Sequence, residues 1–310
     1  MKKRVTVIIV LILTGIVFAQ TLPPGWMLPS SEKFNFLHFV ESAIPPKHIH
    51  PRISLYYWYY TGADLYDDDW DLQDINTTGS ESRIMPVLSF GVGDVVEFGI
   101  AVPFVSNKVV EDITVVTTTD GSGVGDMLIW LKTTVIKNPW FGIRTTVKIP
   151  TGDDDPGGNA LPTGTGQTDF DMGLVFSVMP EKVGFLCDVA ISGRLRFEKE
   201  IDYFGTTLEL NPGNEGRLQL YLGGMPVEGF GVMFGGDGVI SMNDVYDYSG
   251  AIGSQDSTKS FRMNSMLGLR MFYQTPFGIR MDGGLKFDVA GHNTTSGLGF
   301  VLGATYEPQF

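Results

Sequence analysis

The sequence contains a single cysteine, Cys187, so it cannot form an intramolecular disulfide framework. Basic residues are also scarce, with 22 Lys and Arg against 35 Asp and Glu and a formal net charge of -13. This acidity argues against nucleic acid as a partner, because Lys and Arg supply the contacts to its phosphates. Beyond the first twenty residues, no run of about 18 apolar residues could form a membrane-spanning helix. We therefore expect neither disulfide bonds nor such helices to hold the fold together.

The first 19 residues have the organisation of a secretory signal peptide. Lys2, Lys3 and Arg4 form a basic start, an apolar stretch follows, and the small-residue cleavage site ends at Ala19. Cleavage there would remove three basic and no acidic residues, which changes the net charge from -13 to -16. An uncleaved membrane anchor is the alternative. If residues 1–19 are a cleaved signal peptide, the sequence predicts an exported protein.

Long runs of alternating apolar and polar residues begin at residue 52. The clearest example is residues 277–289, FGIRMDGGLKFDV, where apolar and charged positions would occupy opposite faces of a strand. A half-buried strand of a soluble sandwich alternates in the same way. However, these runs reach about 10 to 14 residues, whereas globular strands average about 5 to 6 and a tilted bilayer crossing needs about 9 to 11. Their length therefore favours transmembrane strands.

The alternation predicts twelve strands, separated by connections of two kinds. The strands lie near residues 52–61, 82–91, 95–106, 125–137, 140–150, 168–179, 183–198, 215–224, 229–243, 259–273, 277–290 and 297–307. Short connections (GVGD, KNP, PEK, PVEG and QTP) alternate with mostly longer ones at 62–81, 107–124, 151–167, 199–214, 244–258 and 291–296. This alternation is typical of an outer-membrane barrel, which has short periplasmic turns and longer outer loops.

A Phe-Gly or Gly-Phe pair follows each of these short turns. The phenylalanines are Phe98, Phe141, Phe185, Phe230 and Phe277, at spacings of 43, 44, 45 and 47 residues. Each period contains two long strands, which indicates a repeated hairpin rather than a four-stranded propeller blade. Aromatic residues at one end of every hairpin are typical of the ring that such barrels place at the membrane interface.

We therefore predict an all-β protein of the bacterial outer membrane. Residues 51–310 would form a transmembrane antiparallel up-and-down β-barrel of about 12 strands, in contact with outer-membrane lipids and lipopolysaccharide. A final alternating strand that ends in the aromatic Phe310 resembles the signal recognised by the barrel assembly machinery. Pro308 departs from that signal, because a hydrophobic residue usually occupies its place.

Charged residues gather on the faces that the alternation turns inward. These candidate lumen-lining residues are Arg144, Lys148, Asp188, Arg194, Arg196, Arg217, Arg262, Arg270, Arg280, Asp282, Lys286 and Asp288. An isolated buried charge is costly, so they must pair or meet water. They could neutralise one another in a rigid, closed interior, or they could form a charged path for a solute.

Catalytic, cofactor and metal sites are not supported by the sequence. The acidic run at residues 67–71 lacks the glycine and the final acid of a calcium loop, and Asp153–Asp155 have no fixed partners. His292 is a candidate catalytic histidine, because a serine–histidine lipase exists on a barrel of this size. However, the sequence places no serine to serve as its nucleophile. We predict no enzymatic activity, no cofactor and no metal.

The stretches GVGDMLIWLKTTV, VKIPTGDDDP, TGTGQTDFDMGLVFS and FLCDVAISGRL resemble the outer-membrane family named for the meta-pathway of phenol degradation. The matching positions are Gly125, Asp126, Lys148, Pro150, Thr151, Gly152, Gly164, Thr165, Gly166 and Asp169. The resemblance implies a barrel and the passage of aromatic or other hydrophobic compounds. We expect a passive channel for small solutes of this kind. The alternative is a structural or adhesive surface protein with a closed lumen.

Residues 20–50 do not alternate and form a separate N-terminal segment. Phe36, Leu37, Phe39 and Val40 have roughly helical spacing after the plausible cap at Ser30 or Ser31, and proline pairs bracket the stretch. It could be a periplasmic tail. It could also be a plug inside the barrel, with its apolar residues against a solute; the plug residues would then be Phe34, Phe36 and Phe39.

If the segment is a plug, deletion of residues 22–48 should raise the conductance of the protein in planar bilayers, because a barrel of this size otherwise has room for some water. Unchanged conductance in a correctly folded deletion variant would identify residues 20–50 as a periplasmic tail.

Overall fold

The fold is that of a computed structural model, which describes residues 51–307 except 67–68, 94, 113–115, 138, 155–159, 181, 204–205, 243–244, 249–254 and 257–260. The predicted signal peptide (1–19), the N-terminal segment (20–50) and Phe310 lie outside the described residues. No helix within these ranges is long and apolar enough to cross a bilayer.

The described residues form eighteen strands. They are β1 (Pro51–Tyr66), β2 (Leu72–Val92), β3 (Val96–Ala101), β4 (Phe104–Asp112), β5 (Val116–Val124), β6 (Met127–Lys137), β7 (Trp140–Ile149), β8 (Asp169–Val178), β9 (Gly184–Arg196), β10 (Lys199–Tyr203), β11 (Thr206–Asn211), β12 (Glu215–Val227), β13 (Phe230–Ser241), β14 (Val245–Tyr248), β15 (Gln255–Asp256), β16 (Arg262–Gln274), β17 (Ile279–His292) and β18 (Thr294–Tyr306).

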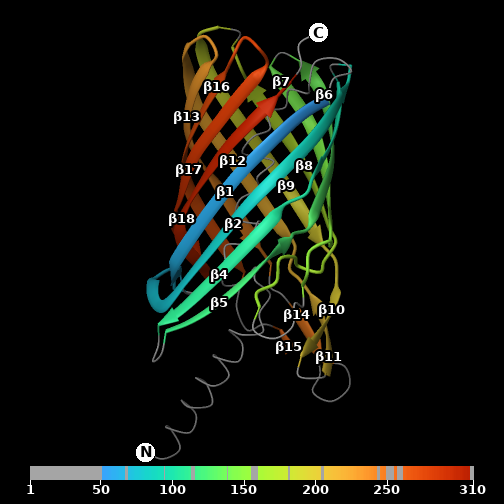
Figure 1. Ribbon diagram of the computed structural model, residues 1–310, viewed down its shortest axis with the longest axis vertical. Coiled ribbons are helices and arrows are strands. Elements are labelled where there is room, and N and C mark those ends of the chain that lie inside the picture. Colours follow the sequence, from blue (N-terminus) through green and yellow to red (C-terminus); the bar gives the residue numbers. More distant parts are fainter. Residues whose placement is uncertain are drawn as a thin grey trace, which may run out of the picture.

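Fourteen strands make one antiparallel sheet, which closes on itself as a barrel (Figure 1). β1 pairs with β2 on one side and with β18 on the other, for example Tyr56 with both Met85 and Gly303. β3 with β4, and β5 with β6, each form one interrupted strand of the wall, so the barrel has twelve strands. The predicted fold class and strand number are confirmed.

The two interruptions lie next to each other. β2 pairs with β3 up to Ala101 and then with β4 from Phe104. Between them, Pro103 has no N–H to donate to the ladder, but its carbonyl accepts a hydrogen bond of 2.7 Å from the backbone N–H of Gly125. Gly125 is part of the break between β5 and β6, so a hydrogen bond joins the two interruptions.

The prediction of long connections between the strands was partly wrong. The connections predicted at 62–81 and 107–124 are largely strand, because β2, β4 and β5 continue beyond the alternating region. Those at 199–214 and 244–258 contain β10, β11, β14 and β15, which form a separate four-stranded sheet beyond the lower end of the barrel (Figure 1). Residues 116–124, VTTTDGSGV, are mostly exposed on both faces. Alternation disappears where both faces of a strand meet water, so the pattern underestimated strand length.

The wall carries its apolar side chains outward and its polar ones inward. On β12, Leu218 and Leu220 are 54% and 45% exposed, whereas Arg217 and Gln219 are 5% and 3% exposed. This arrangement is the reverse of a soluble sandwich and suits a sheet whose outer face contacts lipid. The predicted alternation of faces is confirmed.

The Phe-Gly repeat has a structural reason on each face. Phe98 of β3 points outward, and the next residue, Gly99, lies inside beneath the indole of Trp130 on the neighbouring strand β6. A Cβ atom at Gly99 would come within 2.0 Å of that ring. Gly231 of β13 has the same relation to Phe272 of β16, at 2.3 Å. At these two positions the repeat therefore combines an outer aromatic residue with an inner space that a second ring fills.

Replacement of Leu220 by arginine should lower the free energy of unfolding by about 2–4 kcal/mol if the position is near the bilayer midplane, because its outward side chain would place a charge in lipid. Replacement of the inward Gln219 by alanine should cost much less. Unfolding titrations of the reconstituted variants measure both effects. Equal tolerance of the two changes would contradict the assignment of the two faces.

Candidate functional site: the barrel interior

The barrel interior contains an aromatic cluster, a second apolar cluster on the strands from β9 to β16, and several groups of charges. Aromatic and other apolar side chains gather mainly on β1, β2, β3 and β6. A charged group spans β7, β8, β9 and β12, and β9 lies opposite β1 in the ring of strands. The interior is the candidate site because a solute crossing the barrel would meet both sides.

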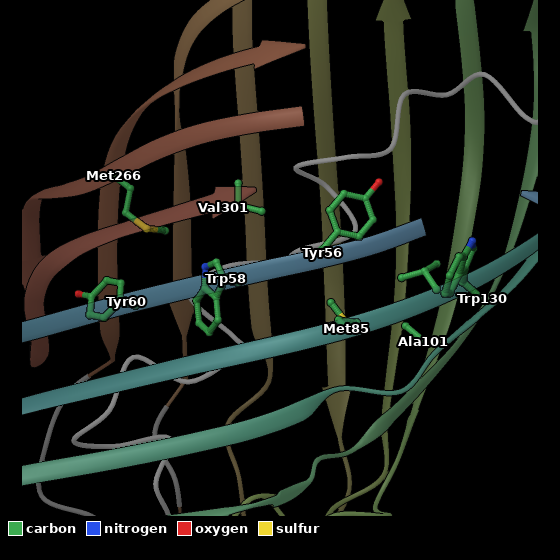
Figure 2. Close-up of a cluster of buried hydrophobic side chains, with 9 residues drawn as sticks. Tyr56, Trp58, Tyr60, Met85, Ala101, Trp130, Met266 and Val301 are labelled. Carbon is green, nitrogen blue, oxygen red and sulfur yellow. The ribbon is translucent and has the colours of Figure 1, made fainter. Parts of the chain in front are cut away.

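The aromatic cluster is centred on three alternating residues of β1, which are Tyr56, Trp58 and Tyr60 (Figure 2). Each of them is at most 4% exposed, although the wall strand itself faces lipid on its other side. The cluster is completed by Met85, Val87, Ala101, Trp130, Met266 and Val301, with Leu128 packed against it. Trp130 is 2% exposed, and its indole N–H has no hydrogen-bond acceptor within the described part of the chain.

Polar groups border this cluster and fix its rings. The Tyr60 hydroxyl donates a hydrogen bond to Asp288 of β17, and the Tyr56 hydroxyl lies 2.8 Å from that of Thr305. The guanidinium of Arg83 is 5.3 Å from the ring centroid of Trp58, which is within the range of a cation–π interaction. The aromatic cluster is therefore buried and has a few polar groups at its border.

The arginine group lies on the opposite side, where charges of alternating sign cross three strands. Asp171 of β8 is in register with Arg194 of β9, which is in register with Glu215 of β12. Arg144 donates a hydrogen bond to Asp171 at 3.0 Å, and Arg217 donates one to Glu215 at 2.6 Å. These contacts stabilise the charges in the interior, where an unpaired charge would be costly.

A second charged group surrounds Tyr221 of β12. Its hydroxyl donates to Asp237 at 2.9 Å, and the same carboxylate forms an ion pair with Lys286 at 2.5 Å. Arg270 lies 5.0 Å from the Tyr221 ring centroid and pairs with Asp188 at 3.1 Å. The side chains of this group link β9, β12, β13, β16 and β17, in addition to the backbone hydrogen bonds between neighbouring strands.

A third group is an almost fully buried ion pair. Lys132 of β6 and Glu97 of β3 are each 1% exposed, and their charged atoms are 2.7 Å apart. Arg52 lies 3.5 Å from the same glutamate and 3.6 Å from Glu307. This group ties the start of β1 and the end of β18 to β3.

The twelve residues predicted to line the lumen all occupy inward-facing positions of the wall. Eight are buried, namely Arg144, Lys148, Asp188, Arg194, Arg217, Arg270, Asp282 and Lys286. The other four, half-buried, are Arg196, Arg262, Arg280 and Asp288. Six of them join the arginine group or the Tyr221 group. That they line a path for solute stays a prediction. The proposed plug residues Phe34, Phe36 and Phe39 lie outside the described residues.

Sequence reasoning missed the acids that partner these cations and the aromatic cluster itself. The missed residues are Tyr56, Trp58, Tyr60, Glu97, Trp130, Lys132, Asp169, Asp171, Glu215, Tyr221 and Asp237. In the run YYWYY of β1, aromatic residues occupy both faces, so hydrophobic alternation cannot distinguish the inward ones. Register between neighbouring strands was the signal needed for the acids, since Asp171, Arg194 and Glu215 are directly opposite one another.

The described residues of the connection at 151–167 pack against the wall rather than extending freely into solvent. The Asp126 carboxylate accepts hydrogen bonds from the backbone N–H groups of Gly152 and Thr165, at 3.2 and 2.8 Å, and from the Thr165 hydroxyl at 2.8 Å. The Thr165 hydroxyl also accepts a hydrogen bond of 2.7 Å from Lys148, which pairs with Asp169 at 2.6 Å. The Lys-x-Pro-Thr-Gly and Gly-Thr-Gly motifs thus meet around one carboxylate.

The same connection covers the edge of β5 that pairs with no strand among those described. The N–H of Leu161 donates to the carbonyl of Asp120 at 2.9 Å, and the hydroxyl of Thr163 donates to the carbonyl of Val124 at 2.8 Å. Hydrogen bonds from a folded connection thus continue beyond the ladder between β6 and β7, which ends at Met127 and Ile149. The expectation of a strand end at Pro150 is confirmed, since β7 ends at Ile149.

Lys199, at the start of the four-stranded sheet, attaches to this connection. It donates to the carbonyl of Thr165 at 2.7 Å and lies 3.4 Å from Asp154. Burial lowers the pKa of Lys199 below its usual range, and the neighbouring carboxylate of Asp154 acts in the opposite direction.

His292 was expected in a connection but is the last residue of β17. Its ring stacks on Phe261 at 4.6 Å between centroids and lies 5.2 Å from Trp70. Its Nδ1 is 2.7 Å from the carbonyl oxygen of Phe261, so the ring packs in an aromatic group at the end of the barrel. No cluster of three or more His, Cys, Asp or Glu residues that could hold a metal is found within the described ranges.

Replacement of Asp126 by alanine should release residues 160–167 from the wall, because it removes a carboxylate with three hydrogen-bond donors. A hydrogen bond to a charged group contributes about 1.5–3 kcal/mol. Amide hydrogen exchange of these residues should therefore accelerate by at least about tenfold. Asp120→Ala is the control, because this side chain is exposed on β5. Equal exchange in the two variants would contradict the role of Asp126.

Comparison with known proteins supports the architecture. An outer-membrane channel from Pseudomonas putida F1 has a similar structure, with a TM-score of 0.68, 14% identity, and coverage of 86% of this chain and 97% of that one. The transport unit of the autotransporter AIDA-I from Escherichia coli matches with a TM-score of 0.48, 10% identity, and coverage of 94% and 100%. No curated protein matches the chain by sequence.

The likeness to the Pseudomonas putida channel concerns the fold. A family model adds sequence evidence, since it matches residues 61–303. That range includes the motifs around Asp126 and most of the barrel wall. The protein is a β-barrel of the bacterial outer membrane. It belongs to the family described as "Putative MetA-pathway of phenol degradation".

Proposed function

We propose that the protein is a passive outer-membrane channel for small hydrophobic or aromatic solutes, and that it acts without catalysis. The observation that carries this proposal is the aromatic cluster on the inner face of the barrel. Binding sites for small molecules are mostly apolar, with a few polar groups that fix orientation. The cluster has this composition, whereas a channel for hydrophilic solutes requires no aromatic lining.

The size of the barrel and the family support the same proposal. A barrel of eight strands fills its interior with side chains, whereas one of sixteen to eighteen strands leaves a wide aqueous channel. Twelve strands fall between these cases and suit selective passage of a small molecule. The family description refers to phenol degradation, a process that requires an aromatic compound to enter the cell.

A structural or adhesive surface protein remains the second candidate. It is favoured by the ion pairs of the interior, such as Lys132 with Glu97, which join neighbouring strands. The four-stranded sheet beyond the barrel could then contact a surface outside the cell. In this case the interior would admit no solute, and the aromatic cluster would act only in packing.

Ion current through the full-length protein in planar bilayers tests the first proposal. Benzyl alcohol, an uncharged aromatic, should reduce the current reversibly, whereas erythritol at the same concentration should not. Trp130→Ala should raise the half-blocking concentration about three- to tenfold, since an aromatic contact contributes about 0.5–1.5 kcal/mol.

Leu131→Ala is the matched control, because this neighbouring side chain faces outward and is 38% exposed. Protein-free bilayers report any effect of benzyl alcohol on the membrane itself. Absence of block by benzyl alcohol, or equal block by erythritol, would favour the structural role.

A further inference from the structure

Arg217 of β12 has unused hydrogen-bonding capacity in the interior. It is 5% exposed, and its Nε and Nη1 atoms are buried without an acceptor in the described part of the chain. Its Nη2 donates to Glu215 at 2.6 Å. A buried charged donor without an acceptor is unfavourable, so a group that accepts from the remaining face of this guanidinium would be stabilised there.

The acids near Arg217 are already used by other donors. The Glu215 carboxylate is shared with Arg194 and Arg196, at 3.8 and 3.6 Å. Asp171 accepts hydrogen bonds from Arg144 at 3.0 Å and from Ser192 at 3.1 Å. The group therefore gathers several guanidiniums around few carboxylates.

Two small residues separate Arg217 from a second arginine in the same row. Across neighbouring strands, Arg144 is in register with Gly173, Gly173 with Ser192, and Ser192 with Arg217. With about 4.8 Å between strands, the two arginine backbones are about 14 Å apart. The Asp171 carboxylate lies between them, since it accepts hydrogen bonds from both Arg144 and Ser192. Arg144 is therefore paired with Asp171, whereas the Nε and Nη1 atoms of Arg217 keep their capacity for an acceptor.

We propose that Arg217 binds the carboxylate of an otherwise apolar solute. This assignment rests on the proposed channel function and narrows its solute class to amphipathic anions such as aromatic carboxylates. A guanidinium stays charged and its planar donors match the two oxygens of a carboxylate. The apolar part of the solute would face the aromatic cluster on the opposite side of the interior.

The experiment compares benzoate with benzyl alcohol and inorganic phosphate as blockers of ion current through the full-length protein. Benzoate should half-block at a concentration at least about tenfold lower than benzyl alcohol, because it adds hydrogen bonds to a charged donor. Phosphate lacks the apolar part and should block less effectively than benzoate. Arg217→Gln should remove the advantage of benzoate but leave block by benzyl alcohol unchanged.

Lys108→Gln is the control, because it removes the same unit of charge from an exposed side chain of β4. It should keep the advantage of benzoate. Heat-modifiable migration in electrophoresis reports whether each variant forms a barrel. If Arg217→Gln does not fold, the comparison of the two aromatics on the unaltered protein still decides the proposal.

Four results would overturn the anion site. If both aromatics block equally, the channel proposal stands without an anion site. If neither blocks, the channel proposal fails as well. If phosphate blocks as effectively as benzoate, the site binds anions in general and not an amphipathic solute. If Lys108→Gln also removes the preference for benzoate over benzyl alcohol, that preference reflects the overall charge of the protein.

Discussion

The need to pair every backbone N–H and C=O inside the bilayer governs the rest of this structure. Hydrocarbon offers no hydrogen bonds, so a sheet that crosses it must close on itself. Here β1 meets β18 in a ladder that runs from Ile53 and Tyr306 to Tyr66 and Thr294. Closure also forces one face of every strand inward, and it thereby creates an interior that must be filled or hydrated.

Closure turns the usual distribution of side chains inside out. Lipid accepts the leucines and phenylalanines of the wall, so the charges must lie inside and compensate one another there. The arginine group and the Tyr221 group do so with acids from neighbouring strands. The aromatic cluster needs no such compensation, because its side chains carry no charge.

The barrel was predictable from the sequence because one bilayer imposes one strand length and one alternation on all its strands. The extended ends of β2, β4 and β5 were not, since both of their faces meet water and the alternation stops. The charged positions of the wall were also found, because charge stands out against apolar neighbours. Their partners could not be found, since pairs such as Arg194 and Glu215 depend on the register between strands.

The rings that lie over glycines couple positions far apart in the chain. A Cβ atom at Gly303 would lie 2.2 Å from the ring of Tyr56, and one at Gly99 would lie 2.0 Å from Trp130. A larger residue at either glycine is tolerable only if the ring opposite becomes smaller, and a lost ring leaves a gap that the glycine cannot fill. In related sequences such pairs should therefore change together, so that covariation between distant positions would record the register of the barrel wall.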